Sequence, residues 1–277
     1  MLQFIHDALF EDIGSGDYST LACIPIYETG GATLKVKEDG IIAGIALAEQ
    51  IFKYVEPAIV IKSYLTDGDR VANGDLAFEV EGHVHTILKV ERLVLNCMQR
   101  MSGIATLTRT YVDKISNYPA KILDTRKTTP LFREYEKEAV RIGGGVNHRM
   151  GLYDMVMLKD NHIDYCGGIE KAIIKTRAWL ENQHLDLKIE VETRNLEEVK
   201  QVLNTGGVHR IMLDNYTPDM LAEAVAMIGG QYETEASGGM NLDNIERYAA
   251  TGVDYISVGG IIHHAVSMDL SLKAIKK

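Results

Sequence analysis

The sequence predicts an α/β protein in which parallel βαβ units follow a smaller α+β domain. From about residue 118 onward, short apolar runs rich in β-forming residues alternate with segments that carry apolar residues at helical spacing. Residues 1 to about 105 instead contain glycine-punctuated stretches in which apolar and polar residues alternate, as they do in antiparallel strands. The two parts of the chain therefore follow different construction rules.

In the N-terminal part, GGATLKVKEDG (30–40) and GDRVANGDLAFEVEG (68–82) are each predicted to form an antiparallel hairpin. Between them, AGIALAEQIFKYVE (43–56) has the apolar spacing of a helix. A long helical pattern then runs from His85 to Ser116, and Ser102-Gly103 is expected to interrupt it.

No low-complexity linker separates the two parts, so we expect them to fold as closely associated domains. The predicted boundaries are an N-terminal α+β sandwich domain over residues 1–105 and a catalytic domain over 106–264. The C-terminal tail, about 265–277, could pack on the first of these.

Polar residues end the predicted strands of the second domain. The strands are expected at 120–124, 155–160, 187–192, 210–214, 232–237 and 254–260, and the residues that end them are Asp124, Lys159, Glu192, Asp214, Ser237 and Gly259. Charged groups that converge from several strand ends are typical of the mouth of a βα barrel, and they favour a barrel over an open doubly wound sheet. Glu190, two residues before Glu192, is expected to point into the surrounding layer.

The charge of the chain is unevenly distributed. The formal net charge is −10, which argues against nucleic acid or a membrane surface as a partner. Residues 89–149 nevertheless carry 12 basic and 6 acidic side chains, a local charge of +6. Part of this excess is expected on an exposed helix face, where Arg133, Lys137 and Arg141 would balance Glu134, Glu136 and Glu138. The remainder indicates a local site for an anionic small molecule.

The cysteines and the chain start both favour a cytoplasmic protein. Cys23, Cys97 and Cys166 are odd in number, far apart and without a CxxC pair, as expected in a reducing compartment. The first twenty residues have no cationic region followed by an apolar core, so we expect no secretory signal. No apolar run approaches the ~20 residues that span a bilayer.

Candidate site residues are densest in DTRKTTP (124–130) and GGGVNHRMGLYDMVMLKDNH (143–162). Thr129 is a candidate helix N-cap with Pro130 at the first helical position. This start would leave Arg126 and Lys127 in the strand-to-helix loop. Unpaired buried cations are costly, so the cations of these two segments imply a ligand that supplies negative charge. Guanidinium groups suit carboxylates, and a lysine ammonium suits a phosphate.

Carboxylates and small-residue loops complete the predicted mouth. Glu192 and Asp214 could hold sugar hydroxyls or Mg²⁺, which prefers oxygen ligands. The loops SGG (237–239) and VGG (258–260) offer backbone N–H groups to a phosphate, as the late strands of many barrels do.

These motifs resemble the nicotinate-nucleotide pyrophosphorylase, or quinolinate phosphoribosyltransferase, family. The resemblance rests on DTRKTTP, AVRIGGGVNHRMGLYDMVMLKDNHI, ERLVLNCMQRMSGIATLT and the late LDN, EASGG and TGVDYISVGG strings, and it extends over essentially the whole chain. It implies that quinolinate and phosphoribosyl pyrophosphate give nicotinate mononucleotide, pyrophosphate and CO₂ on the route to NAD, with Mg²⁺. It also implies an incomplete barrel of seven strands, of which the pattern above finds six.

The resemblance assigns roles to individual residues. The residues implied to bind quinolinate are Arg92, Arg126, His148, Arg149 and Lys159, with Arg92 lent by the partner subunit of a homodimer. Thr125 is also expected to contact a substrate. Lys127 would face phosphoribosyl pyrophosphate, and Glu192 and Asp214 the ribose and the metal, so that the catalytic set is Lys127, Lys159, Glu192 and Asp214. The residues implied to hold the 5′-phosphate, or to lie beside it, are Ser237, Gly238, Gly239, Val258, Gly259, Gly260 and His263. Where the family commonly has Gly-Leu after TTP, this chain has Leu131-Phe132, which bears on the shape of that loop.

Three alternatives remain open at this point. A paralogous protein associated with molybdenum uptake, or a nicotinate-using relative, would share the fold, but a monocarboxylate needs fewer cations than this sequence offers. A catalytically silent ligand-binding protein would not require Lys127, Glu192 and Asp214. An unrelated phosphate-binding barrel isomerase would not require the positive segment.

Overall fold

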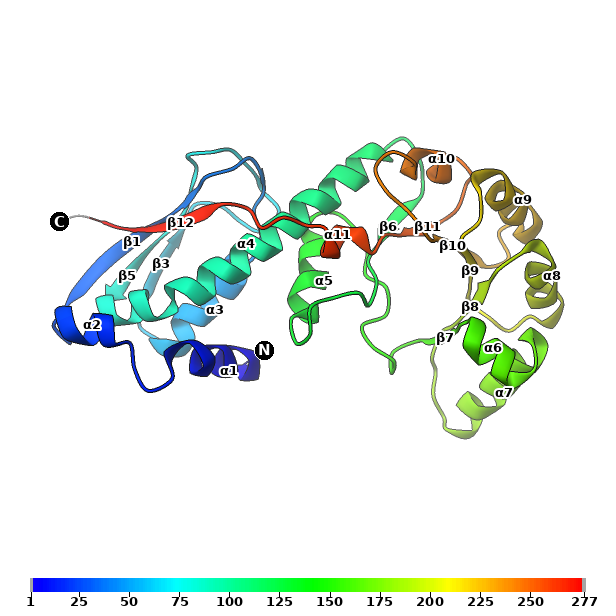
Figure 1. The fold of residues 1–277 in the computed structure, drawn as a ribbon, viewed down its shortest axis with the longest axis horizontal. Coiled ribbons are helices and arrows are strands. Elements are labelled where there is room, and N and C mark those ends of the chain that lie inside the picture. The colour runs from blue at the N-terminus through cyan, green and yellow to red at the C-terminus, as the bar shows by residue number, and fades with distance from the viewer. Residues whose placement is uncertain (1, 276–277) are drawn as a thin grey trace. The chain divides into compact units, whose positions relative to one another are not determined.

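The computed structural model describes residues 2–275, so Met1 and the last two residues of the predicted C-terminal tail lie outside it. The chain divides into two compact units (Figure 1). The N-terminal unit contains the residues up to Arg109, together with Thr129–Gly144 and the segment from His264 on. The barrel unit contains Thr110–Thr128 and Gly145–His263. The segment 129–144 therefore belongs with the N-terminal unit, whereas the boundary predicted from the sequence, between residues 105 and 106, places it in the barrel domain.

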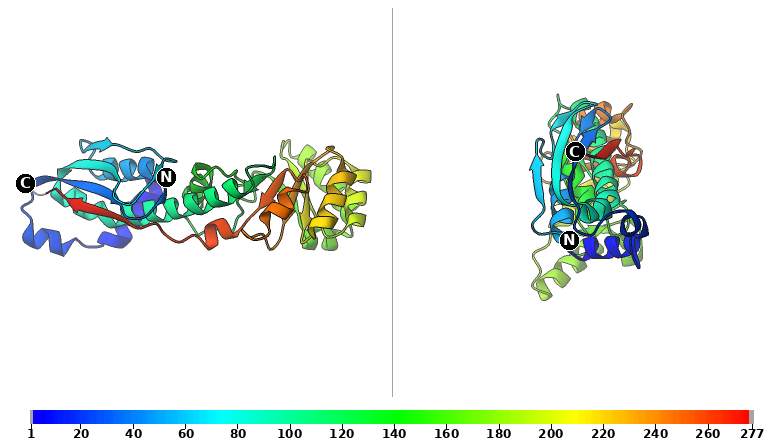
Figure 2. Two further views of the ribbon diagram at one scale, coloured as in Figure 1. Left: turned by 90° about the horizontal axis from the view of Figure 1, so that it is seen from above. Right: turned by 90° about the vertical axis from the view of Figure 1, so that its left-hand side faces the viewer.

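The N-terminal unit is built around an antiparallel sheet with the strand order β12-β1-β5-β3. Its strands are β1 (Thr29–Val36), β3 (Val60–Ser63), β5 (Leu76–His83) and β12 (Leu270–Ala274). Its helices include α1 (Leu2–Ile13), α2 (Tyr18–Cys23) and α3 (Ile45–Val55). The rings of Phe52 on α3 and Phe78 on β5 meet edge to face, so α3 covers one face of the sheet. The C-terminal strand β12 lies along β1, as Figures 1 and 2 show.

The two predicted hairpins are wrong in their pairing. Strand β1 pairs with β5, with Thr29 opposite His83, and the short strands β2 (Gly40–Ile41) and β4 (Arg70–Val71) pair with each other. Each predicted hairpin thus contributes one strand to each pairing. Alternation of apolar and polar residues predicts strands, but it carries no information about their partners.

The long helix is not interrupted. Helix α4 runs unbroken over Val84–Lys114, although Ser102-Gly103 is a sequence signal for a break. A Cβ atom at Gly103 would lie 1.9 Å from the carbonyl oxygen of Val266, and the hydroxyl of Ser102 contacts both backbone groups of Ala43. The small residues therefore allow neighbouring backbone to approach α4 closely.

Helix α5 starts later than predicted. It spans Arg133–Ile142, because Leu131 has φ = 63° and turns the chain out of the helical path, so Pro130 is not in the first turn. The backbone N–H and hydroxyl of Thr129 donate instead to the carboxylate of Glu136 at 2.7 and 2.9 Å. The exposed charged face expected for this helix is also incorrect, because Glu136 and Lys137 are completely buried.

The barrel unit contains a six-stranded sheet with the order β6-β11-β10-β9-β8-β7, and each pair of neighbouring strands is parallel. The strands are β6 (Lys121–Leu123), β7 (Val156–Leu158), β8 (Ile189–Thr193), β9 (Arg210–Asp214), β10 (Glu233–Ser237) and β11 (Tyr255–Ser257). The helices are α6 (Asp160–Cys166), α7 (Ile169–Asn182), α8 (Leu196–Thr205), α9 (Pro218–Ile228), α10 (Ile245–Ala249) and α11 (Gly260–His263). Helices α7, α8 and α9 lie on the outer side of the curved sheet (Figure 1).

The seventh strand position is occupied by a single residue. Val146 forms a parallel bridge with Leu123 of β6, in which its N–H donates to Ile122 and its carbonyl accepts from the N–H of Asp124. The incomplete βα barrel with an N-terminal α+β domain is therefore confirmed. A bridge of one residue has no apolar run, so sequence periodicity does not detect it.

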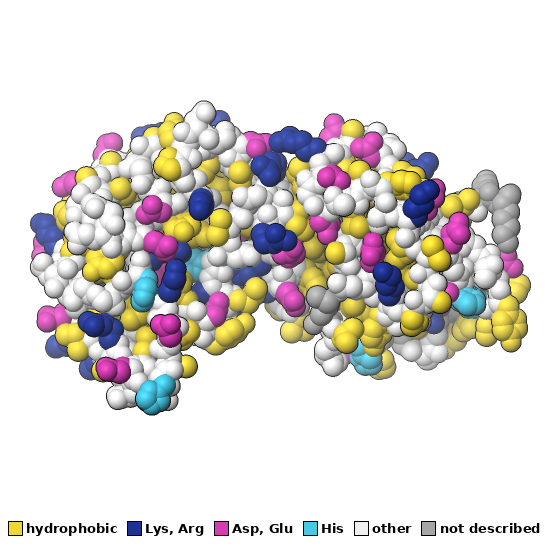
Figure 3. Space-filling model, turned by 180° about the vertical axis from the view of Figure 1, so that it is seen from behind, with side chains coloured by type: hydrophobic (Ala, Val, Ile, Leu, Met, Phe, Trp, Pro, Cys, Tyr) yellow, Lys and Arg dark blue, Asp and Glu magenta, His cyan; other side chains and the backbone are white. Residues whose placement is uncertain are grey.

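The surface shows no single dominant charge on the face drawn in Figure 3, where acidic and basic side chains are interspersed. Within residues 2–275, none of the helices combines the length and the apolar character needed to cross a membrane.

Candidate active site

The carboxyl ends of the six parallel strands bring most of the predicted residues to one edge of the barrel unit. Strand β6 leads directly into Asp124 and the loop that carries Arg126 and Lys127, and β7 leads into Lys159. Glu192 lies near the end of β8, while Asp214 and Ser237 end β9 and β10. Val258, Gly259 and Gly260 follow β11, and His263 is exposed at the end of α11.

Two arginines form the cationic side of this mouth. Burial, and then the neighbouring charge of Arg126, lower the pKa of Arg149, so the two guanidinium groups lie close enough to repel each other. One nitrogen of the Arg149 guanidinium donates to the carbonyl oxygen of Met155 at 3.1 Å. A bound carboxylate would relieve the repulsion and accept paired hydrogen bonds.

Lysines at the mouth are placed by local backbone structure. The hydroxyl of Thr125 accepts the N–H of Lys127 at 3.0 Å, which bends the loop after β6. Lys159 is the N-cap of α6, where its N–H donates to Nδ1 of His162 at 3.0 Å. The ammonium of Lys159 lies 4.0 Å from the carboxylate of Glu192, so the cationic and acidic sides of the mouth adjoin at this point.

Glu192 and Asp214 form the acidic side. Burial, and then the charge of Asp214, raise the pKa of Glu192, so the two carboxylates lie near each other. Asn215 follows in the left-handed conformation at φ = 58°, and its side-chain amide donates to Asp214 at 2.6 Å. Neighbouring carboxylates of this kind fit a hard divalent cation, which would cancel their repulsion.

The glycine loops pack against these charged groups. The N–H of Asn215 donates to the carbonyl of Ser237 at 2.8 Å, and a Cβ atom at Gly238 would lie 2.2 Å from Oδ1 of Asn215. A Cβ atom at Gly259 would lie 3.0 Å from Cδ of Lys127. Gly238 therefore leaves no room for a side chain, whereas Gly259 lies in contact with the side chain of Lys127.

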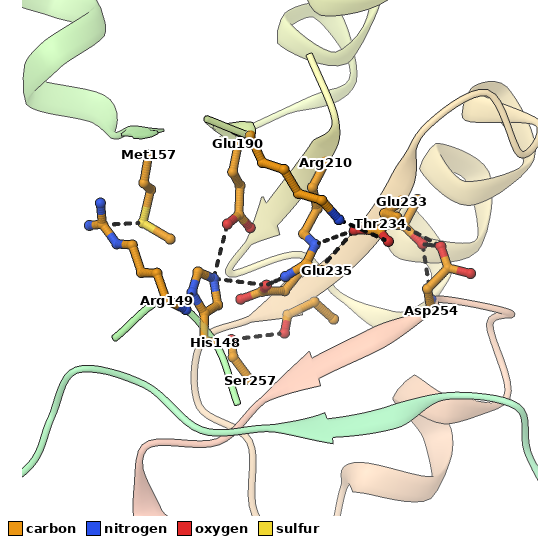
Figure 4. A network of polar contacts seen from close by, with 12 residues as sticks. His148, Arg149, Met157, Glu190, Arg210, Glu233, Thr234, Glu235, Asp254 and Ser257 are labelled. Carbon is orange, nitrogen blue, oxygen red and sulfur yellow. Dashed lines mark hydrogen bonds and ion pairs between the residues drawn. The ribbon is translucent and has the colours of Figure 1, made fainter. Parts of the chain in front are cut away.

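His148 does not face the mouth with its ring nitrogens. Its side chain is 5% exposed, and Nε2 lies 2.9 Å from Glu190 and 3.2 Å from Glu235 (Figure 4). Nδ1 accepts the backbone N–H of Arg149 at 2.6 Å. Burial lowers the pKa of the imidazole, but its contacts with Glu190 and Glu235 outweigh that effect and raise the pKa to about 9. Protonation of Nδ1 would nevertheless place two hydrogens between it and the Arg149 nitrogen, so the 2.6 Å contact favours the ring with its hydrogen on Nε2.

Arg92 is exposed on α4 in the N-terminal unit, whereas the other predicted quinolinate-binding residues belong to the barrel unit.

Several buried residues beneath the mouth are not predicted from the sequence. The prediction that Glu190 points into the outer layer is wrong, because Glu190 faces the barrel interior. Residues two apart in a strand point to the same face, so Glu190 and Glu192 share a face of β8. Glu235 and Arg210 join Glu190 inside the barrel. Asp124, which the sequence does place at a strand end, is also fully buried and accepts the N–H of His148 at 2.8 Å. The same-face rule was the available signal for Glu190, whereas cross-strand partners depend on the tertiary fold.

A βα barrel that gathers cations, carboxylates and glycine loops at the carboxyl ends of its strands belongs to the class of enzymes that act on anionic, phosphorylated substrates. Two family models match nearly the whole chain. The quinolinate phosphoribosyl transferase N-terminal domain matches residues 17–102, and the C-terminal domain matches residues 104–273. The chain belongs to the quinolinate phosphoribosyltransferase family.

Individual relatives and solved structures are similar over the same length. A mitochondrial quinolinate phosphoribosyltransferase [decarboxylating] 2b from Nicotiana tabacum is 48% identical, with 96% of this chain and 80% of that protein covered. A chloroplastic nicotinate-nucleotide pyrophosphorylase [carboxylating] from Arabidopsis thaliana is 46% identical with the same coverage. The crystal structure of NadC from Streptococcus pyogenes superposes with a TM-score of 0.92 at 37% identity, covering 99% of this chain and 96% of that one.

Proposed function

We propose that this chain catalyses the reaction of its family: quinolinate and phosphoribosyl pyrophosphate give nicotinate mononucleotide, pyrophosphate and CO₂ in NAD biosynthesis. The observation that carries the proposal is the contact of the cationic and acidic sides at one barrel mouth, where the Lys159 ammonium lies 4.0 Å from the Glu192 carboxylate. The cations suit a dicarboxylate, and the carboxylates suit ribose hydroxyls or a metal-bound polyphosphate.

Quinolinate binding is assigned to the cationic side. Arg126, Arg149 and Lys159 supply the charges for its two carboxylates, and Thr125 lies within the same loop as Arg126. His148 supports the pocket from beneath. Phosphoribosyl pyrophosphate is assigned to Lys127, Glu192 and Asp214, with its 5′-phosphate on the loops at Ser237–Gly239 and Val258–Gly260 and His263 nearby.

The charges account for the chemistry. Departure of pyrophosphate leaves positive character on the ribose carbon, and Lys127 neutralises the charge that develops on the leaving group. The quinolinate nitrogen attacks that carbon because the two substrates are held together in line. The ribosylated ring is cationic, so it stabilises the carbanion left when the adjacent carboxylate departs as CO₂, and a proton then fills that ring position. The protein contributes positioning and electrostatics.

The carboxylates of Glu192 and Asp214 fit Mg²⁺, because both are hard oxygen ligands. After burial, the charge of Asp214 raises the pKa of Glu192, and a bound cation would relieve this repulsion. Bound there, Mg²⁺ would supply charge for the pyrophosphate group. Removal of divalent cations with a chelator should abolish turnover, and Mg²⁺ should restore it. Full activity in the chelated enzyme would rule out this assignment.

A homodimer that shares its active sites is also part of the proposal. Arg92 is an exposed cation of the N-terminal unit, available to a neighbouring subunit. Arg92→Ala and Lys127→Ala chains should each be inactive, but subunit exchange between them should create one intact site per mixed dimer and recover part of the activity. Mixed dimers without recovered activity would exclude the shared site.

A cytoplasmic location is inferred from the three free thiols, since disulfides are rare in reducing compartments.

The decisive experiment is an assay for nicotinate mononucleotide with quinolinate, using nicotinate as the control substrate. Quinolinate-dependent product together with CO₂ supports the proposed reaction. Product from nicotinate alone would favour the nicotinate-using relative, and no product from either would favour a silent binding protein.

A further inference from the structure

Beneath the mouth lies a buried polar network of Glu190, His148, Glu235 and Arg210 (Figure 4). The side chains of Glu190 and Glu235 are completely buried, and that of Arg210 is 11% exposed. One guanidinium nitrogen of Arg210 lies 3.1 Å from Glu235, and two others contact Glu233 at 2.9 and 3.1 Å. Buried charges that are held this closely restrict each other to one arrangement.

The network fixes both ring nitrogens of His148. Nε2 lies between Glu190 and Glu235, while Nδ1 accepts the N–H of Arg149 at 2.6 Å. Because Nδ1 accepts the Arg149 N–H, the ring hydrogen is on Nε2, the nitrogen that lies within 3.2 Å of both carboxylates. Rotation or displacement of the ring would break both contacts together.

Arg149 is thereby held at two places. Its backbone is anchored by His148, and its guanidinium is anchored at the carbonyl of Met155, 3.1 Å away. The guanidinium lies beside Arg126 against electrostatic repulsion, so its position requires support.

We propose that Glu235, held by Arg210, is a positioning residue for the dicarboxylate substrate, because it orients His148 and through His148 fixes Arg149. This inference rests on the proposed assignment of Arg149 to quinolinate. It assigns a role to two side chains, Glu235 and Arg210, that do not reach the reacting atoms.

A metal ion is the alternative occupant of such a cluster, since His148, Glu190 and Glu235 are all ligand-type residues. The guanidinium of Arg210 at 3.1 Å already places a positive charge on Glu235, and the histidine and carboxylate atoms are at hydrogen-bonding separations. Nε2, the ring nitrogen that faces the carboxylates, carries the hydrogen and so has no lone pair for a metal, which favours a hydrogen-bonded network over a bound cation.

The chain offers a matched pair of variants for the test. Glu233 and Glu235 lie on the same strand and the same face, and both contact Arg210, but Glu235 alone of the two has a contact with His148. Glu235→Gln should raise the KM for quinolinate by roughly 10-fold or more, the scale of losing an outer hydrogen-bonding partner of a binding group. The KM for phosphoribosyl pyrophosphate should be unchanged, and Glu233→Gln should leave both constants at their original values.

Equal constants for Glu235→Gln and the unaltered enzyme would overturn the proposal, and so would an equal rise in both KM values. If Glu235→Gln does not fold, Glu235→Asp in the full chain provides the same comparison with the charge retained. His148→Asn adds a second test, because asparagine keeps an acceptor for the Arg149 amide but loses the contact with Glu235. Glu235→Gln should then have little further effect in the His148→Asn background, whereas independent effects would contradict action through His148.

Arg149→Gln separates failure of the positioning role from failure of the assigned pocket. If Arg149→Gln leaves the KM for quinolinate unchanged, the pocket assignment itself is wrong. If it raises that KM while Glu235→Gln does not, the pocket stands and the positioning role of Glu235 is excluded.

Discussion

Lys127 lies directly against Gly259: a Cβ atom at Gly259 would be 3.0 Å from Cδ and 3.6 Å from Nζ of the lysine. Gly259→Ala should therefore displace the lysine side chain by a few tenths of an ångström while leaving the fold intact, because the backbone at Gly259, in the turn after β11, is not left-handed. We expect kcat/KM for phosphoribosyl pyrophosphate to fall by up to about 10-fold, which is less than the roughly 100-fold loss for a catalytic group misplaced by ~1 Å. In a Lys127→Ala background the same substitution should change little, and a further loss of equal size would show that it acts elsewhere.

Lys127→Ala removes the charge itself. Turnover should fall by roughly 10²-fold or more, the cost of losing one donor that stabilises charge in the transition state. Lys121→Ala is the matched control, since Lys121 is an exposed lysine at the opposite, amino end of the same strand, β6. Steady-state kinetics with both substrates measure the effect, and near-normal turnover of Lys127→Ala would refute its assignment to the leaving group.

The sequence predicts the barrel strands well because most of them are short apolar runs that end at a polar residue. Strand β9 spans Arg210–Asp214 as expected, and the other five differ only at their ends. Six strand ends could be identified as a barrel mouth because parallel strands place their carboxyl ends on one edge. The one-residue bridge at Val146 has no periodic signal, so the seventh position came only from the family resemblance.

Partners between distant segments were not predictable in the same way. The contact of Arg210 with Glu235 and the burial of Glu136 depend on which elements pack together, which local patterns do not encode. The role of Ser102-Gly103 also depends on a distant segment. A pair of small residues inside a helix predicts a break, but here it makes room for the backbone of Val266.

Leu131 adopts φ = 63° although it is not glycine, and its side chain is 93% exposed. The left-handed conformation costs an L-residue roughly 1–2 kcal/mol, and glycine avoids this strain. Part of that gain is offset because glycine loses more conformational entropy on folding. Leu131→Gly should therefore raise the free energy of unfolding by about 0.5–1 kcal/mol. Leu131→Ala should give no such gain, because alanine retains the Cβ atom. Urea unfolding of the two variants decides, and equal stabilities would contradict backbone strain at this position.

Cys97 is buried in the N-terminal unit, and burial raises the pKa of its thiol to about 12. Since the thiolate is the reactive form, Cys97 should resist alkylation in the folded protein up to about pH 9, whereas the exposed Cys23 should be labelled. Mass spectrometry after iodoacetamide treatment at pH 7 and pH 9 would measure this. Unfolding in urea should expose all three thiols, and labelling of Cys97 as fast as Cys23 without urea would disprove the protection.

Gly238 combines a left-handed backbone with a close contact. Its φ is 101°, and a Cβ atom would lie 2.2 Å from Oδ1 of Asn215, the residue whose amide orients Asp214. Gly238→Ala should therefore displace Asn215, free the Asp214 carboxylate and raise the KM for phosphoribosyl pyrophosphate by roughly 10-fold or more. It should also lower the free energy of unfolding by about 1–3 kcal/mol.

The control for Gly238→Ala separates the backbone cost from the cost at the site. Gly229 caps α9 with φ = 57°, and the nearest atom to a Cβ there is 3.7 Å away, in Ala226. Gly229→Ala should lower the free energy of unfolding by about 1 kcal/mol, because it shares the left-handed strain, yet it should leave both KM values unchanged. If the two variants lose stability equally and bind phosphoribosyl pyrophosphate equally well, Asn215 does not hold Asp214 for catalysis. If Gly238→Ala alone raises the KM for phosphoribosyl pyrophosphate, glycine is required at this position for the side chain of Asn215 as well as for its own left-handed backbone.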